Sequence, residues 1–298
     1  MVGMGRAWYD RVPEARELYR QANSRLGWDL AALCFEGPAE ELAKTERCQL
    51  ALFVTSLAGL EGLRALAPEA SPSAMAGLSL GELTALAAAG ACSFADGLYL
   101  VQARAEAMAE CAARHPGAML AVVGLTRDAI EDICRHTGAV LANVNAPDQL
   151  VVSGPVSAVE QAEAALKGSG AKRVARLEVS GAFHSPLMQP AADAFRRALE
   201  RVTISAPRVP VISNVTAKPA ATPEEIRDLL VKQIVSPVLW EPSVRRLIQD
   251  GMRACVEFPP ARVLSGLLRR IDPAVKTALL NEPDDLPKLS DVLAGAAS

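Results

Sequence analysis

The sequence predicts an α/β protein made of one large subdomain with a smaller subdomain inserted into it. Three observations lead to this prediction. Residues 74–89 have the pattern of a short strand, a glycine-flanked turn and a helix. Residues 115–183 follow the order β-α-β-β-α-β, which is typical of ferredoxin-like folds. Strand and helix patterns resume after residue 184, so we expect residues 1–114 and 184–298 to form the large subdomain around an insert at 115–183.

The beginning of the chain is predicted to be helical. Apolar residues recur at three- and four-residue spacing from Trp8 to Leu26, which predicts one amphipathic helix that ends at Gly27. A short helix is expected at 29–35 and a long one around 50–63. Because an α/β sheet usually begins with a strand, this helical start is unusual.

The turn at Gly77-Leu78-Ser79-Leu80-Gly81 is the most informative stretch. Gly-x-Ser-x-Gly between a strand, here 74–76, and a helix, here 80–89, is the pattern of a nucleophile elbow. The nucleophile of an elbow has a strained backbone, and we expect only residues without a Cβ to fit on either side. At a helix N-terminus, free N–H groups can stabilise an oxyanion. A serine in an ordinary turn is the alternative, but the strand-turn-helix context favours Ser79 as a nucleophile.

Arg104 lies on a predicted helix from about Ser93 to Ala113, which Ser93 and Asp96 open as a capping box. Its neighbours on the helix surface are apolar, and it has no acidic partner at helical spacing. Since an unpaired buried charge is costly, we expect a carboxylate from elsewhere. That carboxylate can belong to the protein or to a substrate, and a side chain that reaches solvent is the third possibility. The apolar neighbours are Leu100, Val101, Ala107 and Met108.

The remaining elements complete the α/β pattern. In the insert we expect strands at 119–123, 140–144, 150–153 and 172–179, and helices at 126–136 and 157–166. After the insert we expect helices from 187, at 224–235, 243–249 and 263–271, and strands at 209–213 and 254–258.

A serine nucleophile needs a general base, and histidine is the usual one. The chain has three histidines. His136 ends a predicted helix, where an imidazole often contacts only the last carbonyls. His115 lies in a boundary turn. His184 follows a predicted strand where the insert meets the large subdomain, and it is the best-placed base for Ser79.

Composition and charge limit the possible functions. The chain has 298 residues and a formal net charge of −3, which argues against a nucleic-acid-binding role. The six cysteines lack the C-x-x-C spacing of a zinc site or a disulfide framework, and they suggest reduced residues of a cytoplasmic protein. Charged residues interrupt the start of the chain, so no secretory signal is expected. No stretch reaches the roughly 20 apolar residues of a membrane span.

With these residues in place, the chain resembles the malonyl-CoA:acyl-carrier-protein transacylases of fatty-acid synthesis and the related acyltransferase domains of polyketide synthases. The resemblance extends from Val2 to near the C-terminus, and it implies an α/β-hydrolase-like large subdomain with a ferredoxin-like small one. The stretches that carry it are Val2-Gly3-Met4-Gly5, Glu36 to Leu42, Gly77 to Glu82, Asn143 to Pro147, Phe183 to Met188, Ser213 to Thr216 and Val263 to Leu267.

The resemblance implies catalytic roles for Ser79, His184 and Gln233, and substrate-binding roles for Arg104 and Leu80. Ser79 matches the nucleophile that carries the acyl group as an ester, and His184 matches its base. Gln233 matches the residue whose main-chain carbonyl orients the histidine in place of a carboxylate. Arg104 matches the arginine that pairs with the free carboxylate of malonate, which would explain its apolar surroundings. The main-chain N–H of Leu80 matches one oxyanion donor.

Three further residues match the substrate pocket of the family. Gln49 and Asn143 match polar pocket residues. Phe183 is at a position that is aromatic in members preferring malonyl over methylmalonyl, and excluding one methyl group is worth about 1–3 kcal/mol.

The activity implied by the resemblance is ping-pong transfer of a malonyl group from malonyl-CoA to the phosphopantetheine thiol of acyl carrier protein. No metal or redox cofactor is expected, and neither a nucleic-acid nor a membrane partner; we expect a monomer. Carrier proteins are generally acidic, so a basic docking surface is expected. The candidates are Lys172, Arg173 and Arg176, and the pair Arg269 and Arg270.

The sequence departs from the family pattern at three places. The family begins with a strand leading into a Gly-Gln-Gly-Ser-Gln loop, and this sequence starts just after that point. Either the start codon lies further upstream, which we expect, or the protein lacks a core strand and an oxyanion contact worth roughly 100- to 1,000-fold in turnover. Leu78 replaces the usual histidine beside the nucleophile, and Pro259-Pro260-Ala261-Arg262 replaces Gly-Pro-Gly-Lys.

Two other functions remain possible at this point. A hydrolase of the same fold would pass the acyl group to water and would place a carboxylate, such as that of Asp132 or Asp148, beside His184. A carrier-protein-binding scaffold without catalysis would explain Leu78 and the missing strand. Arg104 argues against the hydrolase, because holding a dicarboxylic acyl group suits malonyl transfer. The scaffold is opposed by the presence of Ser79, His184, Arg104 and Gln233 together.

Overall fold

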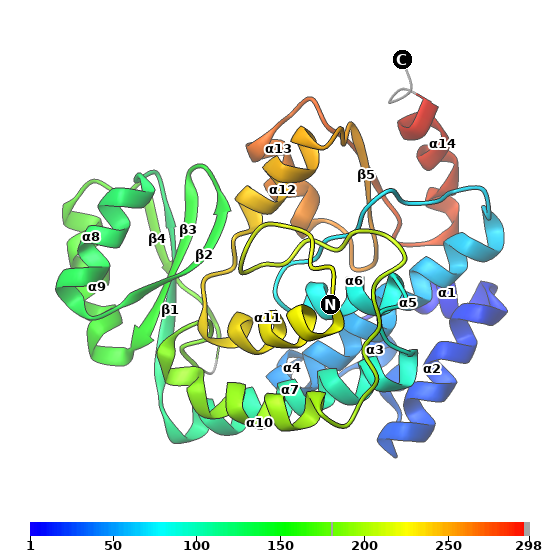
Figure 1. Cartoon of the computed structure of the whole chain (residues 1–298), viewed down its shortest axis with the longest axis horizontal. Helices are drawn as coiled ribbons and strands as arrows, with labels where there is room; N and C mark the ends of the chain where they lie inside the picture. The colour runs from blue at the N-terminus through cyan, green and yellow to red at the C-terminus, as the bar shows by residue number, and fades with distance from the viewer. Residues whose placement is uncertain (180, 295–298) are drawn as a thin grey trace.

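The computed structural model describes residues 1–179 and 181–294, and it confirms the mixed α/β class. A small four-stranded sheet with two helices lies at one end of the molecule, and a larger, mostly helical body lies at the other (Figure 1). The chain passes into the small sheet after residue 114 and returns before residue 186. The subdomain boundaries at 114–115 and 183–184 stay a prediction.

The opening segment forms two helices where the sequence predicts one. α1 (Arg6–Arg11) ends at Val12, and α2 (Pro13–Leu26) begins at the next residue. Proline has no N–H to bond to the preceding turn, but it is well tolerated at the first position of a helix. Pro13 therefore divides the predicted helix in two. Gly27 ends α2 with φ of 72°, as expected.

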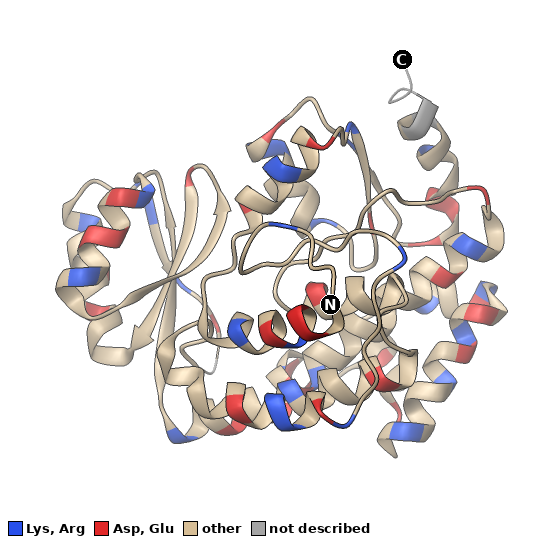
Figure 2. Ribbon diagram, viewed as in Figure 1, with Lys and Arg blue, Asp and Glu red and all other residues tan. Residues whose placement is uncertain are grey.

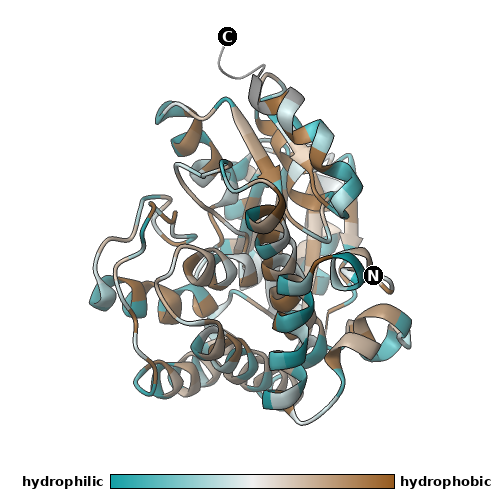
Figure 3. Cartoon of the chain, turned by 90° about the vertical axis from the view of Figure 1, so that its right-hand side faces the viewer, coloured by the Kyte–Doolittle hydropathy of each residue, from teal (hydrophilic) through white to brown (hydrophobic). Residues whose placement is uncertain are grey.

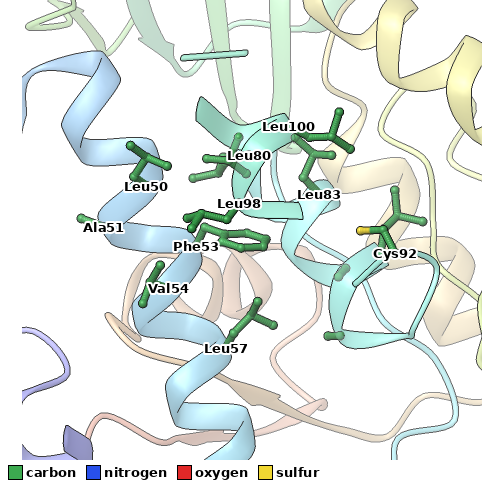
Figure 4. Packing of buried hydrophobic residues seen from close by; sticks show 14 of the residues in the cluster. Leu50, Ala51, Phe53, Val54, Leu57, Leu80, Leu83, Cys92, Leu98 and Leu100 are labelled. Carbon is green, nitrogen blue, oxygen red and sulfur yellow. The ribbon is translucent and has the colours of Figure 1, made fainter. Parts of the chain in front are cut away.

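In the core of the large body, α6 packs against its two neighbours α5 and α7 (Figure 4). The 22-residue α5 supplies Leu50, Phe53 and Leu57, and α6 supplies Leu80 and Leu83. Because these apolar faces are buried together, the N-terminus of α6 is held in a fixed position behind the elbow turn. The helices of this part are α3 (Leu30–Glu36), α4 (Ala39–Ala43), α5 (Thr45–Leu66), α6 (Leu80–Ala88) and α7 (Phe94–Arg114).

The small sheet has the strand order β2-β3-β1-β4 with all neighbours antiparallel, as in a ferredoxin-like fold. One face, with Leu120 and Val152, is packed in a common core with residues of the two helices. The other face, with Met119 and Val151, contacts Phe183 of the returning chain. The elements are β1 (Gly117–Val123), α8 (Arg127–Thr137), β2 (Val140–Ala146), β3 (Gln149–Pro155), α9 (Val156–Gly168) and β4 (Arg173–Arg176).

Two of the predicted strands are reduced to single bridges. Segments 74–76 and 209–213 lie side by side in parallel, but only Met75 and Val211 form a β-bridge. Pro210 lies inside the second segment and has no N–H to extend the ladder. The predicted order of extended segment, turn and helix is therefore correct, but the predicted strand is too long.

The C-terminal part adds helices and a short parallel sheet of β5 (Ala254–Glu257) and β6 (Lys276–Leu279). The sequence predicted β5 but neither β6 nor the last helix. The other elements are η1 (Pro186–Met188), α10 (Gln189–Leu199), α11 (Pro223–Val235), α12 (Trp240–Gln249), α13 (Val263–Ile271), η2 (Pro283–Asp285) and α14 (Leu286–Ala294).

The outer helices are amphipathic, with hydrophilic and hydrophobic residues alternating along each ribbon (Figure 3). Basic and acidic residues are interspersed over these helices (Figure 2). Within the described residues, no helix combines the length and apolar character needed to cross a bilayer. All six cysteines are free thiols in the structure.

Candidate active site

Ser79 occupies the sharp turn that the elbow pattern predicts. It is the N-cap of α6, with φ of 53° and ψ of −104°, a conformation that a residue with a Cβ rarely adopts. A Cβ on Gly77 would lie 2.1 Å from the carbonyl carbon and oxygen of Gly81, so glycine is required at position 77. A Cβ on Gly81 would meet nothing within 4 Å. The expectation that both flanking positions need glycine is therefore wrong for Gly81.

The structure brings Ser79, His184 and Gln233 together from distant parts of the chain. The Ser79 Oγ lies 2.8 Å from His184 Nε2, and His184 Nδ1 lies 2.8 Å from the main-chain oxygen of Gln233. A carbonyl oxygen can only accept, so Nδ1 carries the hydrogen in this contact. Nε2 of the neutral ring is then free to accept the proton of the Ser79 hydroxyl.

The surroundings of His184 keep its imidazole neutral. The residue is buried, and its pKa is lowered from 6.5 to about 4, mainly by burial and secondly by the charge of Arg104. Hydrogen bonds to the backbone at Gln233 and Ser236 act in the opposite direction. A neutral imidazole is the form that can act as a general base.

Arg104 is only 2 % exposed, and its guanidinium contacts uncharged acceptors. It donates to Gln49 Oε1, to Ser79 Oγ at 2.9 Å and to Gln233 Oε1 at 3.1 Å. Burial lowers the pKa of Arg104 to about 10, and the more distant charge of Glu82 partly offsets this. Of the alternatives left open by the sequence, neither an internal salt bridge nor a side chain reaching solvent agrees with these contacts.

Glu82 and Asn214 belong to the same network, although the sequence reasoning gave them no role. Glu82 Oε2 accepts from Gln233 Nε2 at 2.7 Å and from the Asn214 main-chain N–H at 3.0 Å. The Asn214 side chain accepts from the Ser79 N–H at 2.6 Å and donates to the Gly77 carbonyl at 2.8 Å. Two features of the sequence could have pointed to them: a single acidic residue in an otherwise uncharged helix, and an asparagine that follows an apolar run.

Burial raises the pKa of Glu82 to about 7. Hydrogen bonds from the Gln233 side chain, the Asn214 backbone and the Ser213 side chain, and the charge of Arg104, lower it in the opposite direction. A carboxylate with these donors is a strong acceptor in spite of its burial.

The other predicted site residues lie around this network. Leu80 is the first residue of α6, so its N–H is among those that a helix leaves unbonded in its first turn. Phe183, next to His184, packs against both the large core and the sheet face at Met119. Asn143 is buried in β2 and bridges to Val238, but no hydrogen bond among the described residues links its side chain to Ser79.

Leu78 contributes an apolar side chain beside Ser79. It packs, together with Ala76, against a cluster that includes Trp240 of α12 and Leu267 of α13. The site therefore has an apolar contact where the resemblance predicts a histidine.

The carboxylates that a hydrolase would require lie elsewhere. Asp148 pairs with Arg270 at 2.7 Å, and Asp132 pairs with Arg135 at 2.9 Å. The His136 Nδ1 lies 2.8 Å from the Asp132 carbonyl, as expected for a histidine at a helix end. In the described part of the chain, no group of three acidic, histidine or cysteine side chains could hold a metal ion.

Known proteins match this chain over nearly its whole length. Residues 2–278 match the model of the acyl transferase domain family. The chain is 40% identical over 290 residues to the malonyl CoA-acyl carrier protein transacylase of Bacillus subtilis, which covers 96% of this chain and 91% of that protein.

Two solved structures are also similar. The malonyl CoA-acyl carrier protein transacylase from Coxiella burnetii has a TM-score of 0.95 and 37% identity, and the match covers 98% of this chain and 94% of that one. A malonyl-transacylase in complex with a type II PKS acyl-carrier protein has a TM-score of 0.93 and 36% identity, covering 99% and 96% of the two chains.

Proposed function

The chain belongs to the acyl transferase domain family, and from this membership we propose that it transfers a malonyl group from malonyl-CoA to the phosphopantetheine thiol of an acyl carrier protein. The observation that carries the proposal is the buried Arg104. Its guanidinium contacts the nucleophile Ser79, and within the described residues its hydrogen-bond acceptors are all uncharged. A buried cation of this kind is complementary to an acyl group that ends in a carboxylate.

In the first half-reaction, Ser79 Oγ attacks the carbonyl carbon of the malonyl thioester while His184 Nε2 takes its proton. The 2.8 Å contact between these two atoms supports this role. The tetrahedral oxyanion lies near the N-terminus of α6, where the N–H of Leu80 is available to it. When the carbon–sulfur bond breaks, His184 returns the proton to the sulfur of coenzyme A.

Arg104 selects the acyl group by forming a bidentate pair with the malonyl carboxylate. This pair also affects the base. The positive charge of Arg104 is one reason for the low pKa of His184. A carboxylate bound to Arg104 offsets that charge, so His184 becomes a stronger base when malonyl is present than when the site is empty.

In the second half-reaction, the phosphopantetheine thiol gives its proton to His184 and attacks the ester carbonyl. The carbon–oxygen bond breaks, and Ser79 Oγ regains a proton from His184. The new thioester leaves on the carrier protein. This sequence uses no metal or redox cofactor, and it accounts for every proton with the chain's own residues.

An acidic carrier protein would meet a basic surface formed jointly by the small sheet and α13. Arg270, from one candidate cluster, forms an ion pair with Asp148. Arg270 lowers the pKa of Asp148, and the charge of Lys172, from the other cluster, lowers it further by a smaller amount. Both clusters therefore lie near Asp148 and adjoin each other. Arg176 is already paired with Glu163. Lys172 and Arg173 are exposed and have no ion pair among the described residues, so they are the better candidates for docking.

The test is the intact mass of the protein after brief incubation with malonyl-CoA, and in parallel with acetyl-CoA. We expect a malonyl adduct on the wild-type chain and none on Ser79→Ala. In Arg104→Ala, malonyl loading should fall about 100- to 1,000-fold, since one partner of a buried charge pair is removed. Acetyl loading should be retained or increased.

Transfer to a holo acyl carrier protein completes the test. Disappearance of the adduct when the carrier protein is added, with a matching mass gain on the carrier, would support the transacylase. Loss of the adduct to water at the same rate without the carrier would point to a hydrolase. A folded wild-type chain that forms no adduct would refute the proposed function.

A further inference from the structure

Glu82 is a buried carboxylate that accepts hydrogen bonds from two residues of the network described above, Gln233 and Asn214. It lies one helical turn after Ser79 on α6 and is 2 % exposed. One of its oxygens accepts from the side chain of Gln233 and from the main chain of Asn214. The mechanism above gives it no part, although burying a carboxylate is costly even where hydrogen bonds partly compensate for the lost water.

The orientation of the Gln233 amide follows from what surrounds it. A guanidinium can only donate, so the amide atom that faces Arg104 must be the oxygen. The amide nitrogen then faces away from Arg104 and needs acceptors. It finds two of them, Glu82 Oε2 at 2.7 Å and the Ser79 main-chain oxygen at 3.0 Å. Glu82, through the shorter of these two contacts, therefore helps to hold the amide with its oxygen toward Arg104.

We propose that Glu82 is a positioning residue for acyl-group selection: by accepting from Gln233 Nε2, it holds the Gln233 amide oxygen toward Arg104 and so presets the guanidinium for the malonyl carboxylate. This inference rests on the proposed function, because it concerns the choice of acyl group at the same site. Without Glu82, only the Ser79 main-chain oxygen remains as an acceptor for Gln233 Nε2, so the amide is held less firmly with its oxygen toward Arg104. Arg104 would lose one of the contacts that hold it beside Ser79.

The amide variant of Glu82 separates hydrogen bonding from charge. In Glu82→Gln, the main-chain N–H of Asn214 can only donate, so it keeps the new amide oxygen in the place of Oε2. The Gln233 amide then retains its acceptor. In Glu82→Met, a side chain of similar length fills the space but accepts nothing. Glu106→Gln, the same change at an exposed position of α7, is the matched control.

The measurement is the ratio of kcat/KM for malonyl loading to kcat/KM for acetyl loading on Ser79. We expect this ratio to fall roughly 10- to 100-fold in Glu82→Met, because malonyl depends on the preset guanidinium and acetyl does not. Glu82→Gln and Glu106→Gln should keep the ratio within about threefold of wild type. An equal loss for both acyl groups in Glu82→Met would mean that Glu82 only supports the elbow, and it would overturn the proposal. A Glu82→Gln variant as impaired as Glu82→Met would overturn it as well.

A crystal structure of Glu82→Met gives a second readout that does not depend on activity. We expect the contact between Arg104 Nη2 and the Gln233 amide oxygen to be lost. If that contact is retained, the proposal is wrong. Wild-type protein that takes up no malonyl group would refute the proposed function instead, and the crystal structure would then decide the role of Glu82 on its own.

Discussion

Lowering the pH from 8 to about 5.5 should leave malonyl loading of Ser79 almost unchanged, because the surroundings of His184 hold its imidazole neutral. Burial and the charge of Arg104 lower its pKa from 6.5 to about 4. With a pKa of about 4, roughly 97% of the imidazole is neutral at pH 5.5, against roughly 10% for a pKa of 6.5. The two cases differ about tenfold in loading rate at that pH.

Two measurements test this value. The first is kcat/KM for malonyl loading between pH 8 and about 4.5, which reports the groups of the free enzyme. The second uses the variant His115→Gln/His136→Gln, in which His184 is the only remaining histidine. Both replaced residues are exposed and lie outside the site, so the variant should load malonyl like wild type. Its single imidazole signal in an NMR titration then gives the pKa directly.

A half-maximal loading rate near pH 6.5, together with an imidazole signal that titrates there, would refute the reasoning. Such a result would mean that solvent reaches the imidazole of His184, or that a negative charge lies beside it where the described residues place none. Glu82 belongs to the same network, and its pKa is raised to about 7. The profile of Glu82→Gln, measured in parallel, separates its titration from that of His184.

The same pKa changes predict how folding stability depends on pH. The folded state lowers the pKa of His184, so its contribution is present above pH 6.5 and is lost as the pH falls toward 4, at a cost of about 3 kcal/mol. The folded state raises the pKa of Glu82 from 4.5 to about 7, so its contribution is present below pH 4.5 and is lost as the pH rises through 7. On acidification the two effects oppose each other, and Glu82→Gln removes the one that stabilises the folded state. The free energy of unfolding of Glu82→Gln should therefore fall more steeply with decreasing pH than that of wild type, which denaturant titrations would measure.

Two further predictions concern the elbow and the docking surface. Gly77→Ala should lower the free energy of unfolding by about 3 kcal/mol, because its Cβ would overlap the Gly81 backbone, whereas Gly81→Ala should leave it unchanged or raise it by up to about 1 kcal/mol. Thermal unfolding of the two variants checks this, and equal Tm values would contradict it. Reversing Lys172 and Arg173 to glutamate should raise the KM for an acidic carrier protein severalfold and leave malonyl loading from malonyl-CoA unchanged. Unchanged transfer kinetics would exclude these two residues as the docking surface.

The helices and the small sheet were largely predictable, because their patterns are local. Periodicity located α5 and α7 to within a few residues, and the turn signals separated the strands of the small sheet. The strand at 209–213 was not predictable in length, because the effect of Pro210 depends on which neighbour the segment pairs with. β6 has only four residues, and its pairing partner β5 comes about twenty positions earlier.

The sequence by itself determined the chemistry available to this protein. The elbow pattern singled out Ser79, and the lack of alternatives singled out His184. The apolar surroundings of Arg104 on its helix indicated a buried cation. These conclusions required only the residue types and their spacing along one segment.

The tertiary structure decided how these groups are charged and oriented. The pKa of His184 depends on burial by segments distant in sequence, and its ring orientation depends on a carbonyl 49 residues away. The role of Glu82 became visible only where α6 meets Gln233 and Asn214. Hydrogen-bond partners and local dielectric are properties of what folding brings together, so a pattern along the chain cannot supply them.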